Sequence, residues 1–523
     1  MNMIRDIEVY DTTLRDGSQG EGISYTVEDK LRIAHKLDEF GIQYIEGGWP
    51  GSNPKDMAFF EEAKKIKWKH SKLVAFGSTR RAHVKPSADS NLKSLIEADT
   101  EFVTIFGKSW DFQVKEALKT TLSENLAMIE DSIRYLTSKD RQVIYDAEHF
   151  FDGYKRNPEY AIKTLQAAEE GGALVLVLCD TNGGALPHEV AQIVEEVRTK
   201  TKAPLGIHTH NDTGCAVANA ISAVRAGASH IQGTINGIGE RCGNQDLIVI
   251  MANLQLKMGY RCLKPERMKH LTELSRFVAE VGNMIVLNNQ PFVGKSAFAH
   301  KGGVHINAVL KNPETYEHIR PEEVGNERRF LTSELSGKSN IMLKAKDMQF
   351  ELDKEDPKTM EIHKRVQELE NEGYQFEAAE ASFELLIEKT MKTPKVFFEL
   401  IEYRTSIASD PHGLTASEAT VRLKVKGHEE YTVAQGDGPV NALDNALRKA
   451  LIPHYPKLED MHLTDFKVRV IDQKAGTGAK VRVFIQSQDE GGFWTTVGVS
   501  TNIIEASWRA LVDSIEYKLL KRK

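Results

Sequence analysis

The stretch IEVYDTTLRDGSQGEG, residues 7–22, decides the fold. It begins as a short apolar strand, but it ends on a cation, a carboxylate and an amide, namely Arg15, Asp16 and Gln19. The surrounding glycines permit the sharp turn that two neighbouring side chains need in order to face one substrate. We therefore expect this strand to deliver polar side chains to a shared pocket.

Up to about residue 290, further apolar runs of strand length alternate with amphipathic helical segments. The expected strands are 7–14, 44–49, 72–77, 102–106, 142–147, 174–180, 205–209 and 230–234. Strands that alternate with helices in this way build either a closed (β/α)8 TIM barrel or a doubly wound open sheet. The count of eight strands favours the barrel.

The segment Thr26–Phe40 is the clearest of the expected helices. Thr26 is a suitable N-cap, with the carboxylate of Asp29 three residues later, and Gly41 follows as the residue that ends the helix. This combination is the signature of a capping box and a left-handed C-terminal glycine.

Polar side chains follow most of the expected strands. In a barrel of this kind the active site lies at the carboxyl ends of the strands. We therefore expect one pocket that draws on side chains from many strands. The residues concerned are Arg15, Asp16, Glu46, Trp49, Glu148, Thr181, Asn182, His208, His210, Asn236, Glu240, Arg241 and Asn244.

His208 and His210 flank Thr209 in the run LGIHTHND. In a strand, residues i and i+2 point to the same face, so both imidazoles can converge on one point. Two structural histidines would give the same pattern, but the position at a strand end, with Asp16 available, favours a metal ion. This donor set suits Zn, Mn or Mg, and the histidine pair argues mildly against Mg alone.

The chain changes character after residue 290. Residues 291–392 are first rich in His, Gly and Pro and then highly charged, over 353–372, which predicts a linker with small helical subdomains. Residues 393–523 alternate strands with two helices. They carry a faint repeat, because TVAQGDGPVNALDNALRKA from Thr432 matches TVGVSTNIIEASWRALVDS from Thr496. Two copies predict a pseudo-symmetric α+β module, with a binding cleft between its halves as one arrangement.

The composition excludes several classes of protein. At 523 residues the chain exceeds the size of one hydrophobic core, so we expect two or three domains. The net charge of −7 argues against nucleic-acid binding, and no segment is apolar enough to suggest a membrane. Residues 1–6 lack the layout of a signal peptide, and four cysteines without CxxC spacing indicate free thiols. These features predict a cytoplasmic protein.

Three motifs carry a resemblance to a known family. DTTLRDGSQ (11–19), HTHND (208–212) and GIGERCGN (237–244) occur in this order. Together they resemble the metal-dependent acyl-CoA Claisen condensing enzymes on a TIM barrel, the group of the isopropylmalate, homocitrate and citramalate synthases. GDGPVNALDNAL (436–447) and GVSTNIIEASWRAL (498–511) resemble the regulatory domain of that family, which binds an end-product amino acid.

The resemblance implies a set of metal ligands and a set of reacting groups. The implied ligands of the divalent ion are Asp16, His208 and His210, with Asn244 in or near the shell.

The implied reacting groups come from both parts of the chain. Arg15 would polarise the keto group, and Thr181 would hold the substrate carboxylate. Glu148 would lie against the reacting groups, while His305 and Tyr316 would assist proton transfer, from the same or the neighbouring subunit of a homodimer.

The resemblance also implies a reaction. EGGWPGSNPKD (46–56) and FGKSWD (106–111) resemble the branch that condenses acetyl-CoA with pyruvate and water to give citramalate and CoA, on the way to isoleucine. The alternative is isopropylmalate synthesis from 2-ketoisovalerate, on the way to leucine, and the amino-acid effector is correspondingly isoleucine or leucine. Homocitrate synthases usually carry Glu where this chain has Asp16, which argues against that branch of the family.

Three other functions are weaker alternatives. A thioester lyase would normally lack the second domain, and a carboxyltransferase would need a biotin-carrying lysine segment. A non-catalytic amino-acid sensor would have no reason to keep an arginine beside metal ligands.

Overall fold

The computed structural model describes residues 5–331, 342, 345, 356–392, 395–409, 415–471, 476 and 478–521. These form two compact units, one of residues up to 298 with 319–328, the other of 299–318 with the chain from 329 on. The three-part division expected at residues 290 and 392 stays a prediction. Parts of three expectations lie outside the described residues. They are residues 1–4 of the segment compared with a signal peptide, 353–355 of the charged helical segment, and 393–394 at the start of the C-terminal module.

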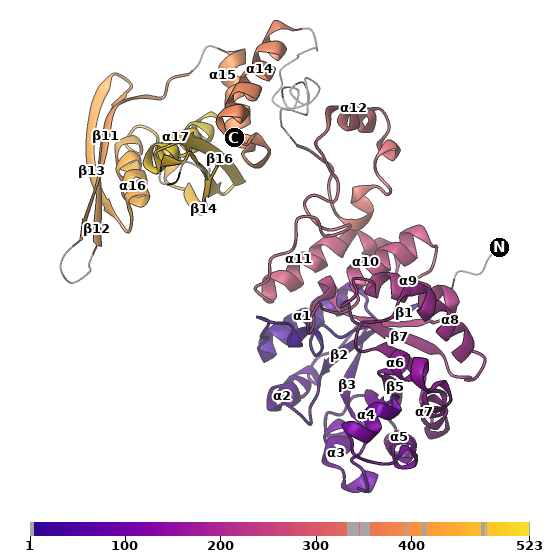
Figure 1. Ribbon diagram of the computed structural model, residues 1–523. Helices are drawn as coiled ribbons and strands as arrows, with labels where there is room; N and C mark the ends of the chain where they lie inside the picture. Colours follow the sequence, from indigo (N-terminus) through magenta and orange to yellow (C-terminus); the bar gives the residue numbers. More distant parts are fainter. Residues whose placement is uncertain are drawn as a thin grey trace. The chain divides into compact units, whose positions relative to one another are not determined.

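The first unit is a closed barrel of parallel strands in the order β1 to β8 (Figure 1). Pairing of β1 with both β2 and β8 closes the ring and confirms the barrel over the open sheet. The strands are β1 (Glu8–Asp11), β2 (Tyr44–Gly48), β3 (Lys72–Ser78), β4 (Phe102–Lys108), β5 (Gln142–Glu148), β6 (Val175–Asp180), β7 (Leu205–Thr209) and β8 (His230–Gly233).

The first strand ends three residues earlier than expected. The backbone N–H groups of Arg15 and Gly17 both donate to the carbonyl oxygen of Thr12, so the chain already turns there. This turn brings Arg15 and Asp16 over the end of the barrel.

Helices surround the barrel. In α1 (Val27–Phe40) the expected capping box of Thr26 and Asp29 is present, and Gly41 ends the helix in the left-handed conformation. The other helices of this unit are α2 (Pro54–Ala63), α3 (Ser90–Glu97), α4 (Asp111–Glu116), α5 (Leu122–Thr137), α6 (Phe150–Arg156), α7 (Pro158–Gly171), α8 (Pro187–Val197), α9 (Ala216–Ala226), α10 (Leu247–Ala252) and α11 (Leu271–Val281).

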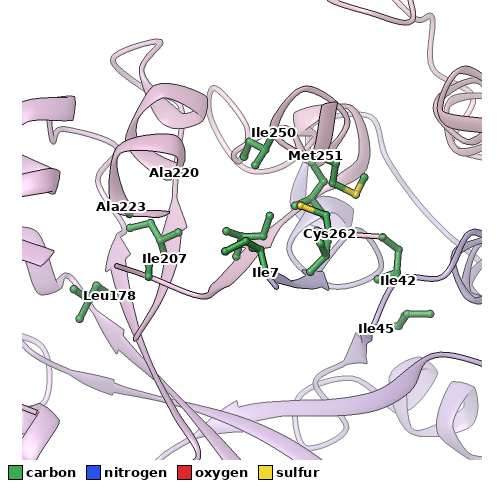
Figure 2. Packing of buried hydrophobic residues seen from close by; sticks show 14 of the residues in the cluster. Ile7, Ile42, Ile45, Leu178, Ile207, Ala220, Ala223, Ile250, Met251 and Cys262 are labelled. Carbon is green, nitrogen blue, oxygen red and sulfur yellow. The ribbon is translucent and has the colours of Figure 1, made fainter. Parts of the chain in front are cut away.

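Apolar side chains pack on both sides of the strands. The larger cluster lies between strands and helices, and Figure 2 shows part of it around Ile7, Ile45 and Ile207. A smaller cluster, which includes Tyr10 and Phe102, comes from alternate residues of β1 to β6 and fills the barrel interior. Burial on both faces explains why the strands read as continuous apolar runs.

The second unit contains the internal repeat that the sequence predicts. Each copy is a three-stranded antiparallel sheet followed by a helix that packs on it, and the two copies share one hydrophobic core. The first copy is β11 (Phe398–Ser409), β12 (Thr415–Val425), β13 (His428–Gly436) and α16 (Pro439–Leu451). The second is β14 (His462–Val470), β15 (Val481–Asp489), β16 (Gly492–Ser500) and α17 (Ile503–Leu520).

Further elements precede this repeat. They are β9 (Ala299–His300), α12 (Gly303–Lys311), β10 (Arg329–Phe330), α14 (Pro357–Glu372) and α15 (Glu380–Met391). Helices α14 and α15 confirm the helical character expected of this region.

Two general expectations can be compared with the structure. All four cysteines are free, as expected. None of the described helices combines the length and the hydropathy that a bilayer crossing requires.

Candidate metal centre and active site

Three side chains from distant parts of the sequence meet at one point. Asp16 comes from the turn after β1, while His208 lies in β7 and His210 directly follows it. The Oδ2 atom of Asp16 lies 3.1 Å from Nε2 of His208 and 3.5 Å from Nε2 of His210, and the two Nε2 atoms are 3.4 Å apart. All three residues are buried.

The outer nitrogen of each imidazole has a hydrogen-bond acceptor. Nδ1 of His208 lies 3.0 Å from Oε1 of Gln232, and Nδ1 of His210 lies 2.8 Å from the carbonyl oxygen of Thr181. Nη2 of Arg241 also approaches Nδ1 of His210, but both of its protons go to the Thr181 carbonyl and to Asp212. Both Nδ1 atoms therefore carry a proton in the neutral rings, which leaves both Nε2 lone pairs free.

This arrangement fits a divalent metal ion. Two Nε2 lone pairs and a carboxylate oxygen face one another at close range, which is a repulsive grouping unless a cation lies between them. Nδ2 of Asn244 donates to Asp16 at 2.8 Å, while its buried Oδ1 has no hydrogen-bond partner among the described residues. Rotation of this amide exchanges the two atoms and directs Oδ1 to the cluster, where it can serve as a fourth ligand.

Charges around the cluster favour the ionised carboxylate. Burial opposes ionisation, but Arg15 and the adjoining imidazoles hold the pKa of Asp16 well below its usual value. Burial also opposes protonation of His208, yet the contact with Asp16 raises the pKa of that ring. Protons and a metal ion therefore compete for the same nitrogen, which makes metal binding weaker in acid.

Arg15 is held from three sides. Its Nε donates to Glu46 at 2.5 Å, its Nη1 lies 3.4 Å from Asp16, and its guanidinium stacks over the ring of Phe76 at 3.7 Å from the centroid. Glu46 is completely buried and also accepts hydrogen bonds from Thr12 and Tyr10. An arginine anchored in this way presents its remaining N–H groups in a fixed direction.

A cavity of about 230 Å³ contains the cluster. Glu148 lines it and forms an ion pair with Lys108, and Thr181 lines it with its hydroxyl accepting from the backbone N–H of His149 at 2.8 Å. The lining residues are Arg15, Asp16, Gln19, Trp49, Phe76, Phe106, Asp146, Glu148, Cys179, Thr181, His208, His210 and Glu240.

Eight of the thirteen side chains expected in the pocket thus line this cavity, and Asn244 is bonded to the cluster. Glu46, Asn182, Asn236 and Arg241 do not line it. His305 and Tyr316 belong to the second unit, where they lie side by side with ring centroids 4.1 Å apart. The roles of both residues in catalysis stay a prediction.

Two buried residues of the site were not singled out from the sequence. Asp146 lies in β5 and accepts a hydrogen bond of 2.9 Å from Nε2 of Gln232, which lies in β8. Burial raises the pKa of Asp146 to about 7. The sequence does contain a signal for Asp146, because it is a polar residue at an inward-facing position of an otherwise apolar strand. Glu46 in β2 is another polar residue of this kind.

Three protein families match consecutive parts of the chain. The HMGL-like family matches residues 6–278, the family described as "homocitrate synthase post-HMGL domain-like" matches 292–373, and the LeuA allosteric (dimerisation) domain matches 377–519.

Individual proteins are similar over nearly the full length. The (R)-citramalate synthase of Geobacter sulfurreducens is 56% identical, with 98% of each chain covered, and that of Aquifex aeolicus is 57% identical, with 99% of each covered. A probable 2-isopropylmalate synthase of Methanopyrus kandleri is 33% identical over 99% of each chain. Among solved structures, an HMG-CoA lyase from Brucella melitensis is 18% identical with a TM-score of 0.45, covering 53% of this chain and 99% of that one. The chain belongs to the family of the (R)-citramalate synthases, with an HMGL-like barrel and a LeuA-type C-terminal domain.

Proposed function

We propose that the protein condenses acetyl-CoA with pyruvate and water to give (R)-citramalate and CoA, a step towards isoleucine. The observation that carries the proposal is the cluster of Asp16, His208 and His210 at the carboxyl end of the barrel, directly beside Arg15. Higher identity to (R)-citramalate synthases than to a probable isopropylmalate synthase supports this branch over the alternative.

Four side chains would hold the divalent ion, which is Mn, Zn or Mg. They are Asp16, His208, His210 and Asn244. When bound, the ion supplies a Lewis acid that polarises a keto oxygen.

Arg15 and Thr181 act on the keto acid. The anchored guanidinium of Arg15 donates to the keto oxygen and stabilises the negative charge that develops there during attack. Thr181 also lines the cavity, where its hydroxyl can donate to the substrate carboxylate. These two contacts orient the keto carbon for attack.

The size of the cavity supports a small keto acid. Phe76 and Phe106 stack on each other, and the ring of Trp49 meets both edge-on. Rigid aromatic walls leave little room for a branched chain, which favours pyruvate over 2-ketoisovalerate. One methylene in such a pocket changes affinity by about 1–3 kcal/mol.

Proton transfer needs a base close to the acetyl methyl group. Glu148, paired with Lys108, and His305, stacked on Tyr316, are the candidates. The base removes a methyl proton, the resulting carbanion attacks the keto carbon, and the alkoxide formed there takes up a proton. Water then hydrolyses the thioester and CoA leaves. His305 and Tyr316 act from the same subunit or from its partner.

The C-terminal domain provides the surface for a homodimer. The apolar side chains of Phe466, Val468 and Val470 on β14 share the helix-side face of their sheet but remain 36%, 41% and 47% exposed. On the corresponding edge strand β11, Ile407 is 60% exposed. A second copy of the chain that covers these apolar side chains would remove them from water.

A cavity of about 540 Å³ between α16 and β14 is the proposed effector site. Aliphatic side chains line it, including Val440 and Leu463, together with the partly buried ion pair of Asp444 and Arg448. An amino-acid ammonium and carboxylate complement this pair, and an aliphatic side chain complements the walls. Isoleucine and leucine both fit this description.

The test is release of free CoA from acetyl-CoA with a panel of 2-keto acids, repeated with isoleucine or leucine present. We expect release with pyruvate, abolition in the Asp16→Asn variant, and inhibition by one branched amino acid. Asp6→Asn is the matched control, because Asp6 pairs with Arg261 at the opposite end of the barrel. Preference for 2-ketoisovalerate would indicate isopropylmalate synthesis, and no release with any keto acid would contradict the proposal.

A further inference from the structure

We propose that Gln232 is a positioning residue: its side-chain oxygen, oriented by Asp146, keeps Nε2 of His208 free to bind the metal ion. This inference rests on the metal site proposed above and names a part of it that lies outside the ligands. It concerns a chain of three buried side chains, Asp146, Gln232 and His208.

Strand register places these groups together. His208 in β7 is the direct partner of Gln232 in the neighbouring strand β8, so both side chains point into the barrel. Oε1 of Gln232 lies 3.0 Å from Nδ1 of His208, and its Nε2 lies 2.9 Å from Oδ1 of Asp146. All three side chains are buried, Gln232 completely.

Asp146 selects the orientation of the amide. The amide NH2 of Gln232 donates to Oδ1 of Asp146, so the amide oxygen faces His208. That oxygen in turn requires a proton on Nδ1. The reversed amide would bring two oxygens together and would present an N–H to Nδ1, which moves the ring proton to Nε2. A protonated Nε2 cannot bind a metal ion.

The second imidazole does not depend on a replaceable side chain. Nδ1 of His210 donates to the backbone carbonyl of Thr181, which every substitution at that position would retain. The tautomer of His208 is therefore the one that a single substitution in the outer shell can disturb. Partners of this kind typically change metal affinity by about 10–100-fold when removed.

The test is a titration of the metal-free full-length protein with Co²⁺, followed by visible absorption of the bound ion. We expect Gln232→Met to weaken binding by about 10–100-fold. Gln232→Asn, which keeps the amide but is one methylene too short to span both partners, should weaken it as well. Gln232→Glu should bind close to the wild-type level, because one carboxylate oxygen still accepts the proton of Nδ1 while the other shares a single proton with Asp146.

Asn219→Leu is the matched control. Asn219 is an equally buried amide, on α9, that donates to the backbone carbonyl of Ala185 and does not contact the imidazoles. Its loss should lower the melting temperature and leave the Co²⁺ affinity unchanged.

The outcomes separate this inference from the metal site itself. Unchanged Co²⁺ affinity in folded Gln232→Met or Gln232→Asn protein, or loss of affinity in Gln232→Glu equal to that in Gln232→Met, would overturn the role of Gln232. If Asp16→Asn binds Co²⁺ as the wild type does, the metal site proposed above fails instead.

Discussion

Replacement of Glu46 by glutamine tests how Arg15 is held at the active site. The buried carboxylate of Glu46 accepts hydrogen bonds from Tyr10, Thr12 and Arg15. Glutamine has nearly the same shape, but one of its two polar atoms is a donor. At least one of the three donors therefore loses its acceptor and meets an N–H group instead.

The magnitude follows from the burial of the pair. Removal of one partner from a buried ion pair destabilises a protein by about 3–5 kcal/mol. Because the amide oxygen still accepts, we expect the low end of this range, about 3 kcal/mol in the free energy of unfolding. Loss of one oriented donor at a developing oxyanion lowers kcat by about 10²–10³-fold. Arg15 keeps its contacts with Phe76 and Asp16, so we expect a decrease of about 10–100-fold from its misorientation.

Two measurements on the same preparation check this prediction. Denaturant unfolding, followed by a probe in the barrel, gives the loss of stability, and CoA release with varied pyruvate gives kcat and KM. Glu8→Gln is the control, since Glu8 is a carboxylate at the first residue of the neighbouring strand β1, away from Arg15, where it contacts His230. A Glu46→Gln variant with the wild-type unfolding midpoint and the wild-type kcat would refute the reasoning.

Two further predictions concern the C-terminal domain. Burial opposes ionisation of Asp489, but Lys518 and Lys521 lower its pKa to about 2, below the unfolded value of about 3.9. The stability from this contact is therefore present above pH 4, and about 2 kcal/mol of it is lost as the pH falls towards 2. Thermal melts from pH 2 to 5 should show this loss in the wild type and not in Asp489→Asn. The same fall of the melting temperature with pH in both proteins would contradict the prediction. Val468→Lys should convert the proposed homodimer to monomers in light scattering, whereas Thr464→Lys should not. A dimeric Val468→Lys variant would exclude β14 from the interface.

Much of the barrel could be predicted because its signals are local. Apolar runs and their spacing indicate strands, and the capping residues Thr26 and Gly41 mark both ends of α1 without any tertiary information. The end of β1 was placed too late because the β-branched Thr12 and Thr13 and the apolar Leu14 continue the strand pattern, whereas the hydrogen bonds to the Thr12 carbonyl already turn the chain.

The candidate ligands were predictable for a similar reason. A period of two places His208 and His210 on one face of a strand, and Asp16 follows another strand of the same barrel. The supporting residues Asp146 and Gln232 were not, and the partner of Glu46 was not either, because all three side chains act across strands. Their partners depend on the register of pairing, which a single sequence does not contain.

Anomalous diffraction from crystals grown with Mn²⁺ and pyruvate tests the central claim most directly. We expect one strong Mn peak within coordinating distance of Asp16, His208 and His210, with electron density for pyruvate bound to the ion and next to Arg15. A peak at another place, or none at this cluster while the crystals bind Mn²⁺ elsewhere, would contradict the account.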